Sequence, residues 1–158
     1  MPLLPKPEVI HLFDLELTVE KPHLVGKTPV GNRQVFRVTG GAFKGERLQG
    51  NVVPGGDDWI TVRDDGTVIQ DVRILLETND KQLIMMSDKG IRTGDRSVIK
   101  TLDDGVEVPI DEYYFHTAPI FETASNQYQW LNNRLFVSRG KQMAGKVIYS
   151  IYQVGELN

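Results

Sequence analysis

The chain has 158 residues, a net charge of −3, a hydrophobic fraction of 40% and no cysteine. These values predict one soluble globular domain, and they exclude a disulfide scaffold, a cysteine nucleophile, an iron–sulfur cluster and a thiolate zinc site. The chain is not basic, so we expect no nucleic-acid partner. No apolar run reaches the roughly 20 residues of a membrane span, so we expect no membrane partner. The N-terminus lacks the apolar stretch of a signal peptide, and we therefore expect a cytoplasmic protein.

The predicted elements begin after an N-terminal arm. Residues 1–8 contain three prolines, which remove backbone donors, so we expect a flexible arm followed by a single domain over 9–158. From Val9 the pattern takes a period of two, in which Phe13, Leu15, Leu17 and Val19 alternate with acidic residues and threonine. This period of two predicts a half-buried strand that ends before Pro22.

Further β-rich runs follow along the first two thirds of the chain. They predict strands at 34–39, 45–53, 59–63, 67–78 and 83–92. We expect the strands to be interrupted at Gly40-Gly41 and at Pro54-Gly55-Gly56. For Gly40-Gly41, a tight bend between strands is favoured over a phosphate-binding loop. Asp64-Asp65-Gly66 and Asn79-Asp80-Lys81 predict two hairpin turns.

The last third contains one segment with a different period. Residues 95–104 predict a short helix, because Val98, Ile99 and Leu102 share one face and Gly105 suits the C-terminal cap. Strand patterns resume at 113–123, 134–139 and 146–154. About nine strands at short spacing predict an all-β closed barrel or a sandwich, and the apolar character of both faces of 146–154 favours a central position for that strand.

Two charged residues inside a strand pattern are the first candidates for a site. Asp71 and Arg73 share one face of the 67–78 strand with Ile69 and Leu75. One interpretation is a solvated pair on an outer face. The other is a pair that points into a barrel lumen, where the carboxylate would be desolvated and the guanidinium would stabilise developing negative charge.

Other candidates lie in two further segments. Asp58 is placed for acid–base chemistry and Trp59 for covering a cavity mouth, although a turn cap and a core residue are the structural alternatives. In 113–123, Tyr114, His116 and Glu122 share one parity and suit a small oxygenated ligand, with His116 as a possible general base. Pro119 is expected to bend this strand. The three histidines lie far apart in sequence, so no metal site is expected, and Asp103-Asp104 is interpreted as a turn.

The chain also resembles the DUF3237 family, also called UPF0311. The resemblance runs from about Val9 to Val154 and rests on Gly40-Gly41-x-Phe43-x-Gly45-x-x-Leu48-x-Gly50, Pro54-Gly55-Gly56-x-Asp58-Trp59, Asp71-Val72-Arg73, Gly90-Ile91-Arg92, Tyr113-Tyr114-Phe115-x-Thr117-x-Pro119-x-Phe121-Glu122-Thr123, Tyr128-x-Trp130-Leu131-Asn132-x-x-Leu135-Phe136-Val137 and Val147-x-Tyr149-x-Ile151-Tyr152. It implies a single antiparallel β-barrel of about eight to ten strands, with a lipocalin-like or allene-oxide-cyclase-like outline. The family is largely uncharacterised and supplies no catalytic set. Many members carry Arg where this chain has His116, which would alter the charge preference of a pocket at that position.

Two functions follow as hypotheses. The first is an isomerase, cyclase or lyase without a cofactor, which acts on a small oxygenated or aromatic metabolite in the lumen, with Trp59, Phe115 and Trp130 as walls and Tyr114 as a polar contact. The second is a carrier that binds a similar ligand without chemistry. An enzyme requires a titratable group with a shifted pKa inside the lumen, whereas a carrier requires an apolar lumen. A scaffold without a ligand is a third alternative, and we expect a homodimer in each case.

Overall fold

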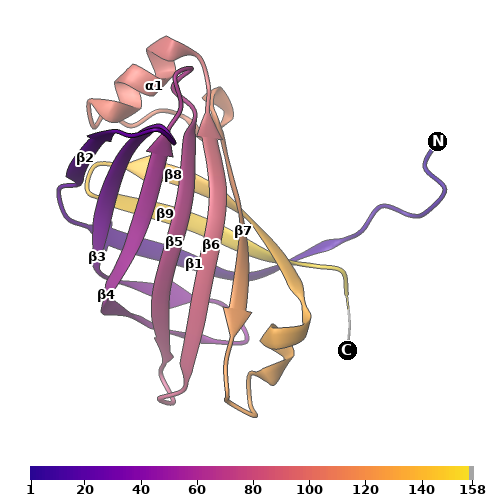
Figure 1. Cartoon of the computed structure of the whole chain (residues 1–158). Coiled ribbons are helices and arrows are strands. Elements are labelled where there is room, and N and C mark those ends of the chain that lie inside the picture. Colours follow the sequence, from indigo (N-terminus) through magenta and orange to yellow (C-terminus); the bar gives the residue numbers. More distant parts are fainter. Residues whose placement is uncertain (157–158) are drawn as a thin grey trace.

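A computed structural model describes residues 1–156 and contains nine strands in that range (Figure 1). The strands are β1 (Val9–Val19), β2 (His23–Lys27), β3 (Asn32–Lys44), β4 (Gln49–Val62), β5 (Val68–Thr78), β6 (Leu83–Thr93), β7 (Tyr114–Glu122), β8 (Leu135–Met143) and β9 (Lys146–Val154). The helical elements are α1 (Arg96–Asp103) and two 3-10 turns, η1 (Ile110–Glu112) and η2 (Gln129–Asn133). No helix within residues 1–156 is long and apolar enough to span a membrane.

Eight of these strands form a closed antiparallel barrel. They pair in the order β1-β9-β8-β7-β6-β5-β4-β3, and the second half of β3 pairs back to β1. The first half of β3 pairs instead with β2, which is therefore an appendage outside the closed ring. The predicted barrel with one short helix near 95–104 is confirmed, whereas β2 lies between Pro22 and residue 34, where no strand was predicted.

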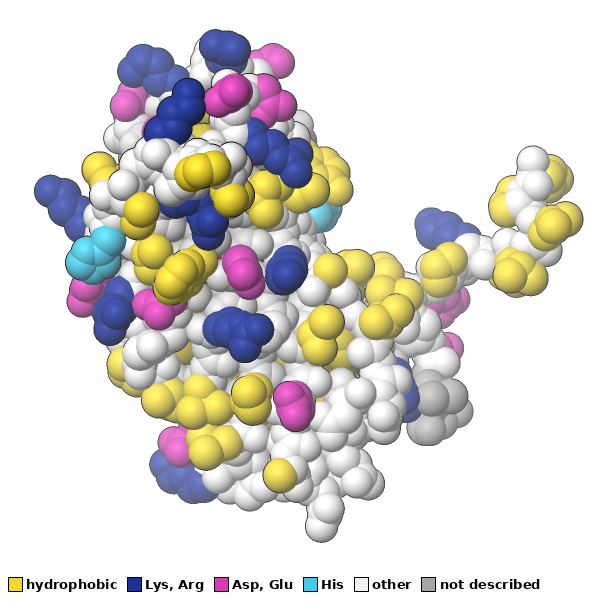
Figure 2. All heavy atoms as spheres, in the orientation of Figure 1, with side chains coloured by type: hydrophobic (Ala, Val, Ile, Leu, Met, Phe, Trp, Pro, Cys, Tyr) yellow, Lys and Arg dark blue, Asp and Glu magenta, His cyan; other side chains and the backbone are white. Residues whose placement is uncertain are grey.

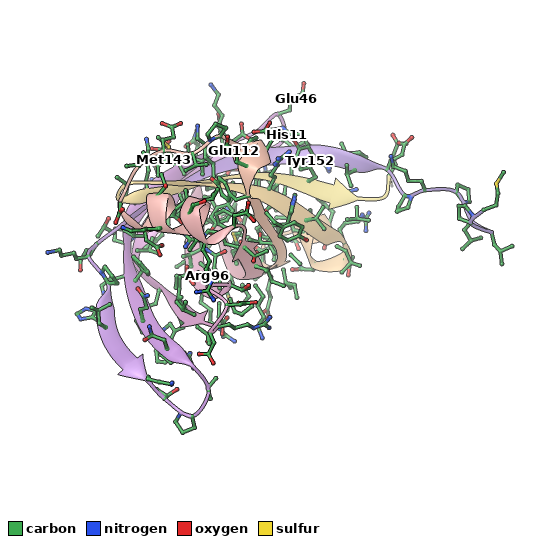
Figure 3. The ribbon with its side chains drawn as sticks, turned by 90° about the horizontal axis from the view of Figure 1, so that it is seen from above. His11, Glu46, Arg96, Glu112, Met143 and Tyr152 are labelled. Atoms are coloured by element: carbon green, nitrogen blue, oxygen red, sulfur yellow. The ribbon has the colours of Figure 1, made fainter. Side chains whose placement is uncertain are left out.

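Alternation along each strand determines which side chains enter the barrel. In β1 the predicted alternation is confirmed from Phe13 onward, since Phe13, Leu15 and Leu17 are buried and the residues between them are exposed; Leu12 is buried as well. Phe121 contacts both Phe13 and Phe136 edge-on, so aromatic rings from β1, β7 and β8 meet inside. Seen from above, side chains crowd the space that the strands enclose (Figure 3). Pro119 leaves the alternation of β7 unbroken, which corrects the expectation that it bends this strand out of register.

The two predicted glycine breaks are irregularities within continuous strands. β3 runs through Gly40-Gly41 and its register against β4 shifts between Arg37 and Ala42. A side chain at Gly41 would place its Cβ 1.9 Å from the backbone oxygen of Glu16, so only glycine allows β1 and β3 to approach and close the barrel. β4 likewise runs through Pro54-Gly55-Gly56, with a register shift between Val53 and Asp57. Both strands remain continuous, because Gly40, Gly41 and Gly55 adopt positive φ and the register shifts locally.

One end of the barrel lies beneath α1 (Figure 1). Ile99 and Leu102 are the buried residues of this helix and join the barrel core. Asp103, interpreted from sequence as a turn residue, is the last residue of the helix, and Gly105 follows with a φ of 80°. The helix therefore attaches to the barrel through a narrow apolar face and a few polar contacts.

Candidate functional site

Six polar side chains gather inside the barrel, and each comes from a different one of six strands, β4 to β9. We call this set the luminal cluster: Asp58, Gln70, Asp88, Thr117, Ser138 and Tyr149. Each member falls on the buried parity of its strand, between apolar residues that form the core. All are less than one tenth exposed, and Asp88 is only 1% exposed. A barrel interior therefore holds two carboxyl groups that are removed from solvent.

Strand register explains why these residues meet. Val72 on β5 pairs with Asp58 on β4 and with Asp88 on β6, so the two carboxyls lie in one cross-strand row. In the adjacent row, Gly90 pairs with Gln70 on one side and with Thr117 on the other. A Cβ at Gly90 would lie 2.4 Å from Thr117 Cγ2, which shows that the threonine side chain leans over this glycine.

Hydrogen bonds connect members of the cluster to one another and to the backbone. The Thr117 hydroxyl donates to Asp88 Oδ2 at 3.0 Å and also contacts the Ser138 hydroxyl. Because the Thr117 proton is directed at Asp88, Ser138 acts as the donor to Thr117. The backbone N–H of Asp71 donates to Asp58 Oδ1 at 3.2 Å. Each carboxyl thus has one fixed donor.

Burial dominates the proton affinity of the cluster. It raises the pKa of Asp58 to about 7; the Asp71 N–H opposes this effect, and the Asp71 charge adds to it. Burial also raises the pKa of Asp88 to about 7, where the Thr117 bond opposes it and the Asp58 charge adds to it. Burial, with help from both carboxyl charges, raises the pKa of Tyr149 well above its ordinary value, so this phenol stays neutral.

Within residues 1–156, two polar oxygen atoms of the cluster have no hydrogen-bond partner. They are Asp88 Oδ1 and Gln70 Oε1, both in residues that are at most 3% exposed. A buried polar atom without a partner costs free energy, and a native structure that retains one calls for an explanation. An oxygenated ligand would satisfy both atoms: its hydroxyl can donate to Gln70 Oε1, and it can donate to Asp88 Oδ1 or accept from it, according to the protonation of that carboxyl. The cluster can therefore bind an oxygenated molecule and exchange protons with it.

Of the residues singled out from sequence, Asp58 and Phe115 are placed inside. Asp58 belongs to the cluster, and the Phe115 ring packs against Tyr149 with a centroid distance of 5.6 Å. Trp130 is only partly buried; it lies on η2, and the Arg47 guanidinium stacks over its ring at 3.5 Å. Its position is outside the cluster, and its contacts are those of a structural residue.

Asp71 and Arg73 lie on the outer face of β5, so the alternative that pointed this pair into the lumen is wrong. The opposite parity of β5 is the buried one, and no ion pair within residues 1–156 joins Asp71 to Arg73. Trp59 is 54% exposed on the same outer face, neither core nor luminal wall, and lines a surface hollow of about 300 Å³ with Asp71 and Arg73. Figure 2 shows charges of both signs beside hydrophobic side chains on the outside of the barrel.

Tyr114, His116 and Glu122 also face outward, with their predicted common parity intact. The Tyr114 and His116 rings meet edge-to-face with their centroids 4.6 Å apart, and His116 Nδ1 lies 3.1 Å from the Ser138 backbone oxygen. His116 is therefore not a luminal base, and the Arg that many family members carry there would not meet a luminal ligand. Within residues 1–156, no three His, Asp or Glu side chains are placed to hold a metal ion.

The sequence analysis missed Gln70, Asp88, Thr117, Ser138 and Tyr149. A signal for one of them was present, because Asp88 shares its parity with Ile84 and Met86 in a predicted strand. A carboxyl on the apolar face of a strand is the pattern that burial makes costly, and it marks a candidate site. Gln70 sits in the same way among the apolar residues of β5.

Comparison with known proteins gives consistent matches over the whole barrel. A family model described as "Protein of unknown function (DUF3237)" matches residues 7–154. A UPF0311 protein of Clostridium acetobutylicum is 34% identical over 90% of this chain and 91% of the relative. The crystal structure of a conserved protein of unknown function from Rhodopseudomonas palustris superposes with a TM-score of 0.93, at 30% identity, over 96% of this chain and 99% of that one.

A more distant relative has a named activity. The hydroalkoxylation enzyme phnH of Penicillium herquei is 25% identical over 80% of this chain and 70% of the relative. A solved enzyme from the same organism has a TM-score of 0.71 at 22% identity, over 98% of this chain and 99% of that one, which shows a shared fold.

Proposed function

The chain belongs to the DUF3237 (UPF0311) family, and on that premise we propose that it is a cofactor-independent acid–base enzyme. Its reaction would be an isomerisation, cyclisation or elimination of a small oxygenated or aromatic metabolite bound in the barrel lumen. The observation that carries this proposal is the luminal pair Asp58 and Asp88, two buried carboxyls whose pKa values are raised to about 7. An acid–base catalyst works best when its pKa lies near the working pH.

The pair suits a reaction that needs a proton removed and a proton delivered. Because the charge on Asp58 raises the pKa of Asp88, losing the first proton makes losing the second harder, and near neutrality the pair holds about one proton. Asp58 is the more exposed of the two and accepts the Asp71 N–H, so it carries the negative charge and acts as the base. Asp88, at 1% exposure, keeps the proton and acts as the acid.

Tyr149 and Gln70 position the ligand between these two groups. The neutral Tyr149 phenol donates to an oxygen on which negative charge develops, as an oxyanion-stabilising donor does. Gln70 Oε1, which has no partner among the described residues, accepts a hydroxyl of the ligand. The Ser138–Thr117 chain holds Asp88 Oδ2, which leaves Oδ1 directed at the ligand.

The distant relative suggests one reaction of this class. Hydroalkoxylation adds an O–H bond across a carbon–carbon double bond: a C–O and a C–H bond form, while the O–H bond and the π bond break. The hydroxyl proton would go to Asp58, and Asp88 would give its proton to the alkene carbon. The pair then exchanges protonation states, and no oxidant or cofactor is needed. The hydroalkoxylation activity for which phnH is named supports this chemistry.

The first test measures proton exchange with a defined probe. Ortho-prenylphenol in deuterium oxide would close to a chroman that carries one solvent deuterium at carbon, which mass spectrometry detects. Asp58→Asn and Asp88→Asn should each lower the rate by about a hundredfold or more, the usual share of one acid or base. Asp64→Asn, which alters an exposed carboxyl in the β4–β5 turn, should leave it unchanged.

The second test makes the proposal independent of that one probe. Carbon-13 NMR titration of the aspartate carboxyls should show two coupled groups that titrate near pH 7 and revert to one when either is replaced by Asn. Ordinary pKa values for both carboxyls would refute the acid–base role. Saturable binding of oxygenated aromatics without any deuterium incorporation across a panel of them would favour the carrier.

A further inference from the structure

Arg92 is the only basic residue among the buried residues of the described chain, residues 1–156. It is 7% exposed and lies on the inward parity of β6, two positions beyond Gly90 and four beyond Asp88. A cation in a low-dielectric interior is costly unless an anion accompanies it. The identity of that anion is therefore informative about what the lumen is built to receive.

The anion that accompanies Arg92 comes from outside the barrel wall. Arg92 Nη2 donates to Asp103 Oδ1 of α1 at 3.0 Å, and Nη1 donates to Gln142 Oε1 at 3.5 Å. Arg92 Nε is buried and has no acceptor in the part of the chain that the structure describes. A guanidinium binds a carboxylate best through two parallel bonds, and here one donor of its fork is unused.

Asp103 is a replaceable partner. Its side chain is 61% exposed, so a solvated carboxylate at the rim balances a charge that is otherwise buried. It ends α1, a helix of eight residues that buries only Ile99 and Leu102 and whose N-cap residue, Asp95, makes no side-chain capping bond. Figure 3 looks down on this helix over the barrel end. Asp103 can leave Arg92 and remain hydrated, which lowers the cost of exchanging it for another anion.

We propose that Arg92 binds the carboxylate of an anionic substrate, and that Asp103 occupies the guanidinium when the lumen is empty. This inference rests on the proposed function, because the same ligand would meet Asp88 at its other end. Four residues of strand place the two Cα atoms about 13 Å apart, at about 3.3 Å per residue. Side chains on a strand stand roughly perpendicular to the sheet, so the polar ends of Arg92 and Asp88 keep about this separation, which a hydroxylated aromatic ring with a short acidic chain spans.

The competition between Asp103 and the ligand is directly testable with an acid and its amide. The probes are para-coumarate and para-coumaramide, which differ in charge at one end. Asp103→Asn removes the carboxylate that competes with the ligand for Arg92, and it changes no side chain of the luminal cluster. It should therefore tighten para-coumarate binding about tenfold without affecting binding of the amide. Asp104→Asn is the matched control, because Asp104 is exposed on the same turn and pairs with Lys100.

Arg92→Met tests the cation itself. It should weaken para-coumarate binding by about tenfold or more and leave the amide unchanged, since a charged hydrogen bond is lost with only one of the two probes. In the wild-type and Asp103→Asn proteins, the Arg92 Nε–H resonance should shift with the acid and stay in place with the amide. This NMR readout does not depend on the stability of the Arg92→Met variant.

Two outcomes would overturn the inference. One is an Arg92 Nε–H resonance that millimolar para-coumarate fails to move in Asp103→Asn. The other is Asp103→Asn and Arg92→Met variants that bind acid and amide in the wild-type ratio. Failure of the proposed function has a different signature, in which carboxylate binding at Arg92 persists while deuterium exchange is independent of Asp58 and Asp88.

Discussion

The Thr117 hydroxyl donates a 3.0 Å hydrogen bond to Asp88 Oδ2, and this bond is the one opposing influence on a carboxyl whose pKa burial raises to about 7. Thr117→Val removes the donor while keeping the shape, so the pKa of Asp88 should rise further. The loss should also destabilise the protein by about 1–3 kcal/mol, because the Ser138 hydroxyl loses its contact as well. Carbon-13 NMR titration and urea unfolding measure the two effects. Thr117→Ser should preserve both values, and an unchanged Asp88 pKa in Thr117→Val would contradict the assignment.

The two buried carboxyls should make the protein less stable as the pH rises. Their pKa values are about 7 in the folded protein, against 3.8 for an ordinary Asp, so between pH 4 and pH 7 the folded state binds more protons than the unfolded state. The free energy of unfolding therefore falls by about 4 kcal/mol for each carboxyl between pH 4 and pH 7. Above pH 7 it levels off. Urea unfolding from pH 4 to pH 8 measures the slope.

Asp88→Asn should flatten that slope, because the neutral amide has no proton to lose and no longer repels Asp58. Asp64→Asn serves as the comparison and should keep the wild-type slope, since its carboxyl is exposed. A wild-type protein that gains stability from pH 5 to pH 7 would show that these carboxyls are not the groups that dominate the pH dependence.

Asp71 affects the lumen from outside it. Its side chain faces solvent, but its backbone N–H binds Asp58 Oδ1 and its charge raises the pKa of Asp58. Asp71→Asn keeps the N–H and removes the charge, so the pKa of Asp58 should fall below that of the wild type. NMR titration measures the pKa of Asp58 in the wild-type and Asp71→Asn proteins, with Asp64→Asn again as the control. A rise in the Asp58 pKa would mean that the substitution disturbs the backbone bond.

Gly41 tests the closure of the barrel. Alanine there would place its Cβ 1.9 Å from the Glu16 backbone oxygen at a φ of 145°, where β1 and β3 pair. Gly41→Ala should cost about 3 kcal/mol or more, because backbone must move. Gly55→Ala has a similar positive φ of 118° but meets nothing within 4 Å, so it should cost about 1 kcal/mol. Thermal unfolding of both variants gives the comparison, and equal losses would leave the steric account unsupported.

Local pattern was sufficient for most of the fold. Alternation in 9–19, the turn chemistry of Asp64-Asp65-Gly66 and the helical spacing of Val98, Ile99 and Leu102 each depend on residues that are close in the chain. Such signals predicted β1, the β4–β5 hairpin and α1, and the resemblance to the family implied the barrel. β2 was missed because its five residues pair only with the edge of β3 and bury little.

The site was harder to predict, since apolar residues occupy both faces of the β5 segment. Ile69 and Leu75 made the Asp71–Arg73 face look as suitable for an interior as the Val68–Val72 face, and only closure of the barrel decided between them. Local sequence pattern located the strands of the closed barrel, although not β2, and showed which residues of a strand share a face. Tertiary structure decided which face is inside, and it brought Asp58 and Asp88 from separate strands into one low-dielectric space, where removal from water raises the pKa of both carboxyls.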